Sequence, residues 1–284
     1  MRVFPLGWPT GQAENHLAGK PQALFIFCKG DPVGLKSTVK SGLTGMAHAR
    51  GYELIAAWRM DRQPLVKHLQ QLIRHYGIDC ILDVGGNMGQ YHDMLREEVG
   101  FKGWIWSFEP VAKYVAMLKD KAVTDARWKV FDFALGSTEG TAEINVTKSP
   151  GLNSFLEPRT DAVEGFWSPD SVTGKEVVRI RVLDDLFARL LDDHGCQAPY
   201  LKLDTQGFDH EVLKGASHSL ARVRALQTEA SIKPLYEGMP DYRDITNYLG
   251  ERGFELSGMF AVSHDADLRL IEYDCVMVNH RLAH

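Results

Sequence analysis

Cysteine is scarce in this sequence and is not arranged in pairs. The chain contains four cysteines, which are Cys28, Cys80, Cys196 and Cys275, and no two of them form a C-x-x-C motif. Disulfide frameworks and structural zinc sites both depend on regularly spaced cysteines. The spacing therefore argues against both kinds of site and favours a protein that works in a reducing compartment.

Long apolar runs and clusters of basic residues are also missing. No stretch approaches the roughly 20 apolar residues that span a membrane, and the early run Ala23–Cys28 is too short for a signal-peptide core. The formal net charge is −5, with no run of Lys and Arg, whereas binding to phosphate backbones needs concentrated positive charge. We therefore expect a cytoplasmic protein with no membrane span and no nucleic-acid partner.

Short apolar segments alternate with amphipathic ones from residue 80 onward. This alternation is typical of an α/β fold, in which crossover helices join the strands of a parallel sheet. A further helix is expected over 61–76, where apolar residues recur at helical spacing. The expected strands are 80–84, 104–108, 128–133, 200–204 and 225–229, and the expected helices are 88–99, 111–121, 184–192, 209–220 and 242–252.

Two features interrupt the alternation. Strand-like runs at 141–146 and 176–182 flank a loop rich in Ser, Pro and Asp. The chain then ends in two strand-like runs, 254–260 and 268–278, which are joined by a polar turn. Such a turn predicts an antiparallel hairpin rather than another crossover.

Residues 1–60 differ in composition from the rest of the chain. Gly and Pro punctuate them, and their apolar runs are short. We interpret them as an N-terminal extension or lid, placed before a single α/β domain over residues 61–284. A chain of 284 residues suits one large domain with such an addition.

A glycine-rich turn follows the first strand of the alternation. The segment Asp83-Val84-Gly85-Gly86-Asn87-Met88-Gly89 runs from an apolar strand through a turn into a helix. Glycines such as Gly85 and Gly89 let the backbone approach a ligand, and nucleosides dock at this edge of an open α/β sheet. Glu109 ends the following strand, where a carboxylate can accept hydrogen bonds from both ribose hydroxyls.

The same turn discriminates between two nucleoside cofactors. Dinucleotide-binding enzymes carry G-x-G-x-x-G, and no register fits, because Asn87 or Met88 stands where the second glycine is needed. The D-x-G-x-N-x-G form instead places Asp83 where it can hold the cationic amino-acid end of S-adenosyl-methionine. At the end of the third strand, Asp132 and Phe133 would lie beside adenine, although they also suit a turn and ordinary core.

Further segments match one family in their order and spacing. They are Asp83 to Gly89, Ser107-Phe108-Glu109-Pro110, Ala134-Leu135-Gly136, Val182-Leu183-Asp184, Leu201-Lys202-Leu203-Asp204-Thr205-Gln206-Gly207, Glu211-Val212-Leu213-Lys214-Gly215-Ala216, and Glu229-Ala230-Ser231 with Pro234-Leu235-Tyr236. In these segments the chain resembles the FkbM family of S-adenosyl-methionine-dependent methyltransferases, from about residue 80 to the end. The first eighty residues lie outside the resemblance.

The resemblance implies a Rossmann-like class I methyltransferase fold, with a mostly parallel seven-stranded sheet and an antiparallel C-terminal strand. It also implies methyl transfer to a hydroxyl on a sugar, glycolipid or secondary metabolite, so the partner would be a small-molecule or glycan acceptor. By motif position, Asp83, Gly85 and Asn87 would line the methionine side of the cofactor. Glu109 would hold the ribose.

Methyl transfer to an aliphatic hydroxyl requires alignment and removal of a proton. Asp204 ends an apolar strand, where an acid carries a desolvation cost unless it is used. Glu229 ends the next strand at the same rim, so the two carboxylates could act as base and orienter or bind a divalent cation. No His or Cys cluster at ligand spacing supports a metal site. His210 is another possible base, although with Asp209 it also suits an ordinary helix start.

Loops and the extension are where we expect specificity for the acceptor. The loop 148–171 carries Phe155, Phe166 and Trp167, which could stack on an acceptor or pack against the domain. Two rival functions remain on the sequence alone. One is a Rossmann-type NAD oxidoreductase, and the other is a nucleoside-binding module without catalysis.

Overall fold

The computed structural model of the chain describes residues 49–50, 59–168 and 171–282. The chain divides into two units, Met1–Gln63 and Pro64–His284, and the second contains the α/β fold. Most of the expected extension over residues 1–60 lies outside the described residues. Its role as a lid therefore stays a prediction.

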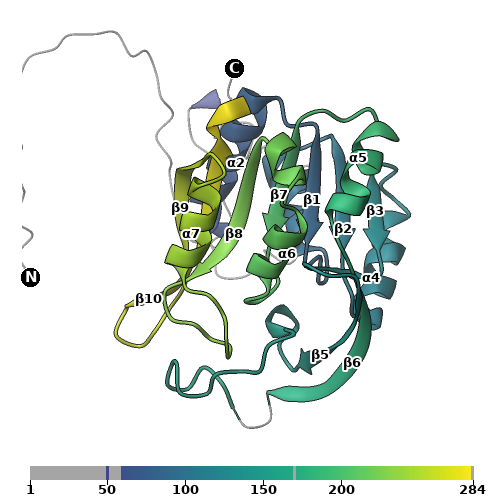
Figure 1. Cartoon of the computed structure of the whole chain (residues 1–284). Coiled ribbons are helices and arrows are strands. Elements are labelled where there is room, and N and C mark those ends of the chain that lie inside the picture. Colours follow the sequence, from purple (N-terminus) through teal and green to yellow (C-terminus); the bar gives the residue numbers. More distant parts are fainter. Residues whose placement is uncertain (1–48, 51–58, 169–170, 283–284) are drawn as a thin grey trace, which may run out of the picture. The chain divides into compact units, whose positions relative to one another are not determined.

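Strands and helices alternate in the order that the sequence predicts (Figure 1). The strands are β1 (Cys80–Val84), β2 (Trp104–Phe108), β3 (Trp128–Phe131), β4 (Ala134–Leu135), β5 (Gly140–Thr147), β6 (Val172–Arg181), β7 (Pro199–Leu203), β8 (Ala225–Ser231), β9 (Phe254–His264) and β10 (Leu270–Asn279). The helices are α2 (Gln63–Tyr76), α3 (Gln90–Met94), α4 (Ala112–Ala122), α5 (Asp184–Asp192), α6 (Asp209–Gly215) and α7 (Tyr242–Gly250). Short helical turns are η2 (Leu95–Val99), η3 (Pro150–Leu152), η4 (Ser219–Arg222) and η5 (His280–Leu282).

Two expected elements are shorter than predicted. The strand run 128–133 divides, because β3 ends at Phe131 and the chain then enters a second sheet as β4. The predicted helix 209–220 ends at Gly215. The carboxylate of Asp184 accepts hydrogen bonds from the backbone amides of His218 and Ser219, and the chain there turns into η4.

The main sheet has seven strands in the order β3-β2-β1-β7-β8-β10-β9. Neighbouring pairs from β3 to β8 are parallel, whereas β10 is antiparallel to both β8 and β9. The antiparallel C-terminal strand and the predicted hairpin are therefore confirmed. This topology is the Rossmann-like class I methyltransferase fold that the resemblance implied.

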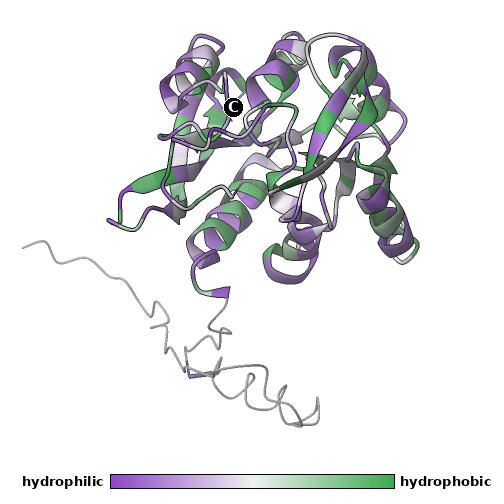
Figure 2. Ribbon diagram, turned by 90° about the horizontal axis from the view of Figure 1, so that it is seen from below, coloured by the Kyte–Doolittle hydropathy of each residue, from purple (hydrophilic) through white to green (hydrophobic). Residues whose placement is uncertain are grey.

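Helices cover both faces of this sheet, since its strands are apolar on both sides. Leu82 and Val84 of β1 pack in one core with residues of α5, α6 and α7, which lie in front of the sheet in Figure 1. Ile81 points the other way and packs with residues of α2, η2 and α4. Figure 2 shows green and purple residues striped along the same helices, as expected for helices with one buried face. No helix in the described part of the chain is long and apolar enough to cross a membrane.

A second, three-stranded sheet in the order β4-β6-β5 follows the third strand of the main sheet. Its strands β5 and β6 are antiparallel, and the segment 148–171 lies between them in the sequence. Residues of 150–168 pack against 232–239 in a small apolar core around Trp167 and Tyr236. We call these two segments the cap. Hydrogen bonds from Arg159 N and Trp167 Nε1 to the carbonyl of Leu235, at 2.8 and 3.0 Å, join them.

Candidate active site

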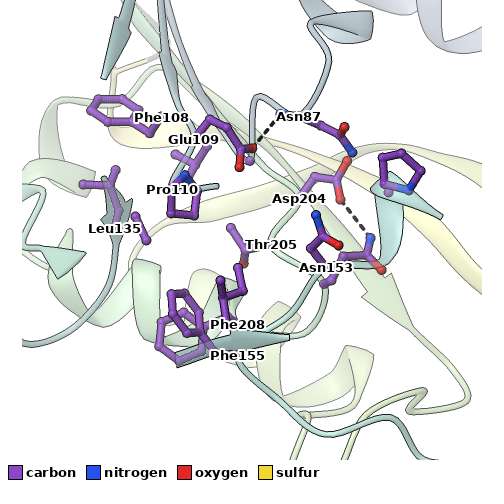
Figure 3. Close-up of a pocket in the computed structure, with 17 residues that line it drawn as sticks. Asn87, Phe108, Glu109, Pro110, Leu135, Asn153, Phe155, Asp204, Thr205 and Phe208 are labelled. Carbon is purple, nitrogen blue, oxygen red and sulfur yellow. Dashed lines mark hydrogen bonds between the residues drawn. The ribbon is translucent and has the colours of Figure 1, made fainter. Parts of the chain in front are cut away.

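A pocket that is open to solvent lies at the carboxyl ends of β1, β2 and β7 (Figure 3). The carboxyl ends of parallel strands are where ligands bind in open α/β sheets. One part of the lining comes from the strand ends, β4 and β5, and consists of Val84, Gly85, Asn87, Phe108, Glu109, Pro110, Ala134, Leu135 and Ile144. The other part comes from the cap and the turn after β7, and consists of Pro150, Gly151, Asn153, Phe155, Asp204, Thr205, Gln206 and Phe208.

Gly85 is where the turns after β1 and β7 meet. Its φ is +83°, and a Cβ at this position would lie 2.0 Å from the carbonyl oxygen of Asp204. Only glycine fits such a contact in this backbone conformation. The glycine-rich turn therefore brings the β1 edge of the pocket directly against Asp204.

Glu109 is buried beside the same turn, with 4% of its surface exposed. Its Oε2 accepts a hydrogen bond from the backbone N–H of Asn87 at 2.8 Å, and its Oε1 accepts one from Val111 N at 2.9 Å. Burial raises the pKa of Glu109 to about 7, although these two donors lower it. The carboxylate thus reaches the pocket with lone pairs left for further donors.

The side chain of Asn87 supplies a second unsatisfied acceptor in the lining. Its Oδ1 is buried, and no described residue donates a hydrogen bond to it. A buried acceptor without a partner is costly unless a ligand or water satisfies it. Glu109 and Asn87 thus form an acceptor-rich edge, next to apolar residues such as Phe108 and Leu135. Ribose hydroxyls could donate to this edge, and the flat face of a base could lie against the apolar residues.

Asp83 lies behind the turn rather than in the pocket lining. It is fully buried, accepts a hydrogen bond from Ser107 Oγ at 2.9 Å, and forms an ion pair with Lys202 Nζ at 3.0 Å. The same ammonium donates to the carbonyl of Gly85 at 3.2 Å. Burial disfavours the charged lysine, but the carboxylates of Asp83 and Asp204 raise the pKa of Lys202 above its usual range. Lys202 therefore connects the carboxylate of Asp83 to the backbone of the turn.

Asp204 is the sequence-predicted catalytic residue that lies in the pocket. Its side chain is 43% exposed, and two donors from its own segment hold it. The side-chain amide of Gln206 donates to Oδ1 at 3.0 Å, and Lys202 Nζ lies 3.5 Å from Oδ2. The carboxylate is thus fixed at the edge of the pocket while one side remains accessible.

Glu229 is joined to Asp204 by a residue that sequence reasoning missed. Gln206 Nε2 also donates to Glu229 Oε2 at 2.9 Å, so one amide bridges both carboxylates. Glu229 does not line the pocket, and burial together with neighbouring acids raises its pKa well above the usual range. The one signal in the sequence was that Gln206 lies inside the segment 201–207, which matches the family. A glutamine after the end of a strand is not a pattern that marks a site residue.

The structure does not bring four of the other predicted site residues to the pocket. Asp132 is exposed and paired with Arg179 at 2.7 Å, and Phe133 packs in the main core. His210 packs edge-on against Tyr248 of α7, with ring centroids 5.0 Å apart. Gly89 has a φ of +85° and lies close to Leu118 and Trp128, so it serves helix packing. Ala134 and Leu135 line the pocket where Asp132 and Phe133 were expected.

The aromatic residues of loop 148–171 take different positions. Phe155 lines the pocket, and the centroid of its ring lies 4.7 Å from that of Phe208. In Figure 3 the two rings lie across the pocket from Glu109. Trp167 is buried in the cap core, where its ring lies 5.3 Å from that of Tyr236, and Phe166 packs against this core. One of the three aromatic side chains therefore faces the ligand space.

No group of metal-ligating side chains among the described residues includes Asp204 or Glu229. The atoms close enough to share an ion belong to Asp79, Cys80 and Cys196. These residues lie at the amino ends of β1 and β7, at the opposite edge of the sheet from the pocket. The described residues thus offer no preformed cation cage beside the pocket.

The chain is similar to a family domain and to several known proteins. Residues 83–256 match the methyltransferase FkbM domain. The 2-O-methyltransferase NoeI of Sinorhizobium fredii is 26% identical over 199 residues, which cover 67% of this chain and 78% of that protein. The crystal structure of methyltransferase FkbM from Methylobacillus flagellatus has a TM-score of 0.44 at 14% identity, over 90% of this chain and 73% of that one. Fibrillarin of Aeropyrum pernix, solved with S-adenosyl-methionine bound, has a TM-score of 0.41 at 12% identity, over 76% and 74%.

The sheet topology, together with the match to a methyltransferase domain, defines a Rossmann-like methyltransferase. The chain belongs to the FkbM methyltransferase family, because the family domain matches more than half of it. Its cofactor is S-adenosyl-methionine, and the NAD oxidoreductase is thereby ruled out.

Proposed function

We propose that this protein transfers a methyl group from S-adenosyl-methionine to a hydroxyl oxygen of a neutral small molecule or glycan. The observation that carries the proposal is the place of Asp204, a half-exposed carboxylate fixed by two donors at the pocket edge. A carboxylate there can accept the proton of an acceptor hydroxyl. The similarity to a 2-O-methyltransferase supports oxygen as the acceptor atom.

The charge of the lining supports a neutral acceptor. Among the described lining residues, the ionisable side chains are those of Glu109 and Asp204, and both are acids. An acceptor that carries a phosphate or carboxylate would meet like charge at close range, which is unfavourable. A hydroxyl on a sugar or a secondary metabolite avoids this repulsion. Phe155 and Phe208 offer apolar faces on which such a molecule can stack.

We assign the cofactor to the β1 and β2 edge. Glu109 accepts hydrogen bonds from the ribose hydroxyls, and Asn87 Oδ1 accepts one from the cofactor. Gly85 lets the backbone approach the methionine portion, and Asp83 supports this turn through Lys202. Ala134 and Leu135, rather than Asp132 and Phe133, contact the base.

The chemistry is a displacement in which the acceptor oxygen bonds the methyl carbon as the carbon–sulfur bond breaks. The bound cofactor supplies an activated methyl on a sulfonium, which becomes a neutral thioether. Asp204 orients the hydroxyl and takes its proton, so that no free alkoxide forms. Glu229 supports Asp204 from behind through Gln206 rather than touching the acceptor.

Incubation with methyl-labelled cofactor and a panel of acceptors tests the reaction. The panel should contain neutral sugars and hydroxylated metabolites, with their phosphorylated or carboxylated counterparts as matched controls. We expect a neutral hydroxyl compound to gain one labelled methyl, as detected by mass spectrometry. Cofactor binding without transfer to any acceptor would favour the binding module without catalysis, and label only on nitrogen or carbon would reject O-methylation.

Replacement of the base tests Asp204. The Asp204→Asn variant should lower turnover roughly a hundred- to ten-thousandfold, the usual effect of losing a general base, with cofactor affinity nearly unchanged. If Asp204 acts as a base, a chelator should leave wild-type turnover intact. If the chelator abolishes turnover and an added divalent cation restores it, Asp204 instead binds a metal ion. Full activity of a folded Asp204→Asn variant in chelator would refute both roles.

A further inference from the structure

The side-chain amide of Gln206 lies between three polar side chains of the site. Its side-chain nitrogen lies 3.0 Å from Asp204 Oδ1 and 2.9 Å from Glu229 Oε2, and its side-chain oxygen lies 2.9 Å from the hydroxyl of Tyr236. Every polar atom of this buried amide therefore has a partner. Asp204 directly follows β7, Glu229 lies in β8, and Tyr236 belongs to the cap.

We infer that Gln206 is a positioning residue for methyl transfer, whose amide, oriented by Tyr236, holds Asp204 against the acceptor hydroxyl and ties it to Glu229. The inference rests on the role proposed above for Asp204. Gln206 acts through the carboxylate and is not itself assigned to the reacting atoms.

The contacts with the three partners favour one orientation of the amide. An NH₂ group donates two hydrogen bonds, which match the two carboxyl groups, whereas a flipped amide would set its oxygen against both of them. Tyr236 donates its hydroxyl proton to Gln206 Oε1, and so favours the same orientation. The carbonyl of Leu152, which belongs to the cap, lies 3.1 Å from the same hydroxyl and is a second acceptor for its one proton.

The backbone of Gln206 is also held from the cap. Its φ is +53°, which is uncommon for a residue other than glycine. Its carbonyl accepts a hydrogen bond from Ser154 Oγ at 2.7 Å. Because Ser154 and Tyr236 both belong to the cap, the cap fixes the main chain and the side chain of Gln206 together.

A neutral bridging group suits the charges around Glu229. Burial raises the pKa of Glu229 well above its usual range, and the facing acids Asp204, Glu272, Asp274 and Asp209 raise it further. Lys202, with its ammonium 3.5 Å from Asp204, is the cation on the other side. A neutral amide can therefore join the two carboxyl groups without adding charge to this acidic cluster.

The first test observes the amide without any acceptor. In full-length protein labelled with ¹⁵N-glutamine, the Gln206 side chain should give two separate, slowly exchanging amide protons, assigned by their loss in Gln206→Met. Asp204→Asn should change the chemical shift of one amide proton, and Glu229→Gln should change that of the other. Tyr236→Phe should bring both chemical shifts closer to those of a solvent-exposed glutamine. A Gln206 amide that exchanges like a surface side chain, or that ignores Asp204→Asn, would overturn the inference.

The second test separates positioning from mere stability. With the acceptor methylated in the panel, Gln206→Met should lower kcat about ten- to a hundredfold and leave cofactor affinity unchanged. The acid limb of its pH profile should move up by about half to one unit, because an ionised carboxylate loses a donor. The matched control is Thr228→Val, which removes a buried hydroxyl bound to Asp209 at 2.7 Å. It should lower the melting temperature without moving the pH profile.

The outcomes distinguish the inference from the function on which it rests. If Asp204→Asn retains full turnover, the role proposed for Asp204 fails, whatever Gln206 does. If Asp204→Asn is slow but Gln206→Met and Tyr236→Phe keep wild-type kcat and pH profile, only the positioning role fails. A double variant, Asp204→Asn with Gln206→Met, should be no slower than Asp204→Asn alone.

Discussion

Glu109 combines burial with two backbone donors, and this makes its charge depend on pH near neutrality. Its pKa of about 7 belongs to the protein without cofactor. Ribose hydroxyls would donate to the ionised carboxylate and so favour that form. Cofactor binding should therefore be linked to loss of a proton from this residue.

The affinity for S-adenosyl-homocysteine should consequently fall as the pH is lowered from 8 to 5.5. Below about pH 7 the carboxyl must lose a proton before it can accept from the ribose, so affinity should fall by up to about tenfold per pH unit. Calorimetry at several pH values measures this slope. The Glu109→Gln variant should bind more weakly and show a flatter profile, and an equal slope in both proteins would reject the ribose assignment.

At the scale of elements, the cap supplies one wall of a pocket whose other wall is the sheet edge. Segment 150–168 contributes Asn153 and Phe155 to the pocket, and segment 232–239 supports Gln206 through Tyr236. These segments pack mainly on each other, around Trp167 and Leu235. Exchange of cap residues should therefore alter the choice of acceptor more than the affinity for cofactor.

The N-terminal extension is the other part of the chain that we relate to the acceptor. All described residues that line the pocket lie after residue 83, and helix α2 buries Leu65, Val66, Leu69 and Leu72 in the main domain. A truncated protein that begins near Asp61 keeps this helix, so it should fold and bind cofactor with wild-type affinity. We expect it to lose turnover, because we propose that the extension serves the acceptor. Normal turnover by the truncated protein would show that the lid interpretation is wrong.

At the scale of the whole molecule, several buried acids make stability depend on pH in an uncommon direction. Burial raises the pKa values of Glu109 and Glu272 to about 7 and that of Asp274 to about 6, and it raises that of Glu229 well above the usual range. In the unfolded chain such groups titrate near pH 4. Between about pH 4.5 and 7 the folded protein thus holds more protons than the unfolded one.

The free energy of unfolding should therefore decrease as the pH rises through this window, by up to about 1.4 kcal/mol per pH unit for each extra proton. His68 and His210 act oppositely, because burial lowers their pKa values, but they are two groups against five when the buried Asp209 is included among the acids. Thermal melting of cofactor-free protein should give a higher melting temperature at pH 5.5 than at pH 7.5. The Glu272→Gln variant, which keeps a partner for Ser231, should reduce the difference. A melting temperature that rises with pH would contradict this account.

Local patterns in the sequence determined the order of elements and the edge of the sheet that binds cofactor. The strands Cys80–Val84 and Trp104–Phe108 have the bounds predicted for them, because continuous apolar runs are buried on both faces of a parallel sheet. Glu109 reaches the pocket for a similar reason. Its place at the end of a strand follows from the strand itself, as does that of Asp204.

Only the tertiary structure decided which polar groups meet. Asp83 pairs with Lys202, Asp132 turns outward to Arg179, and Gln206 joins Glu229 to Tyr236. His210 was a reasonable base by sequence, yet its helix presents it to Tyr248 instead of the pocket. Periodicity determines which face of an element a residue occupies. The partner of a polar group depends on strand order and on how separate loops pack, and neither is contained in the spacing of residues along one segment.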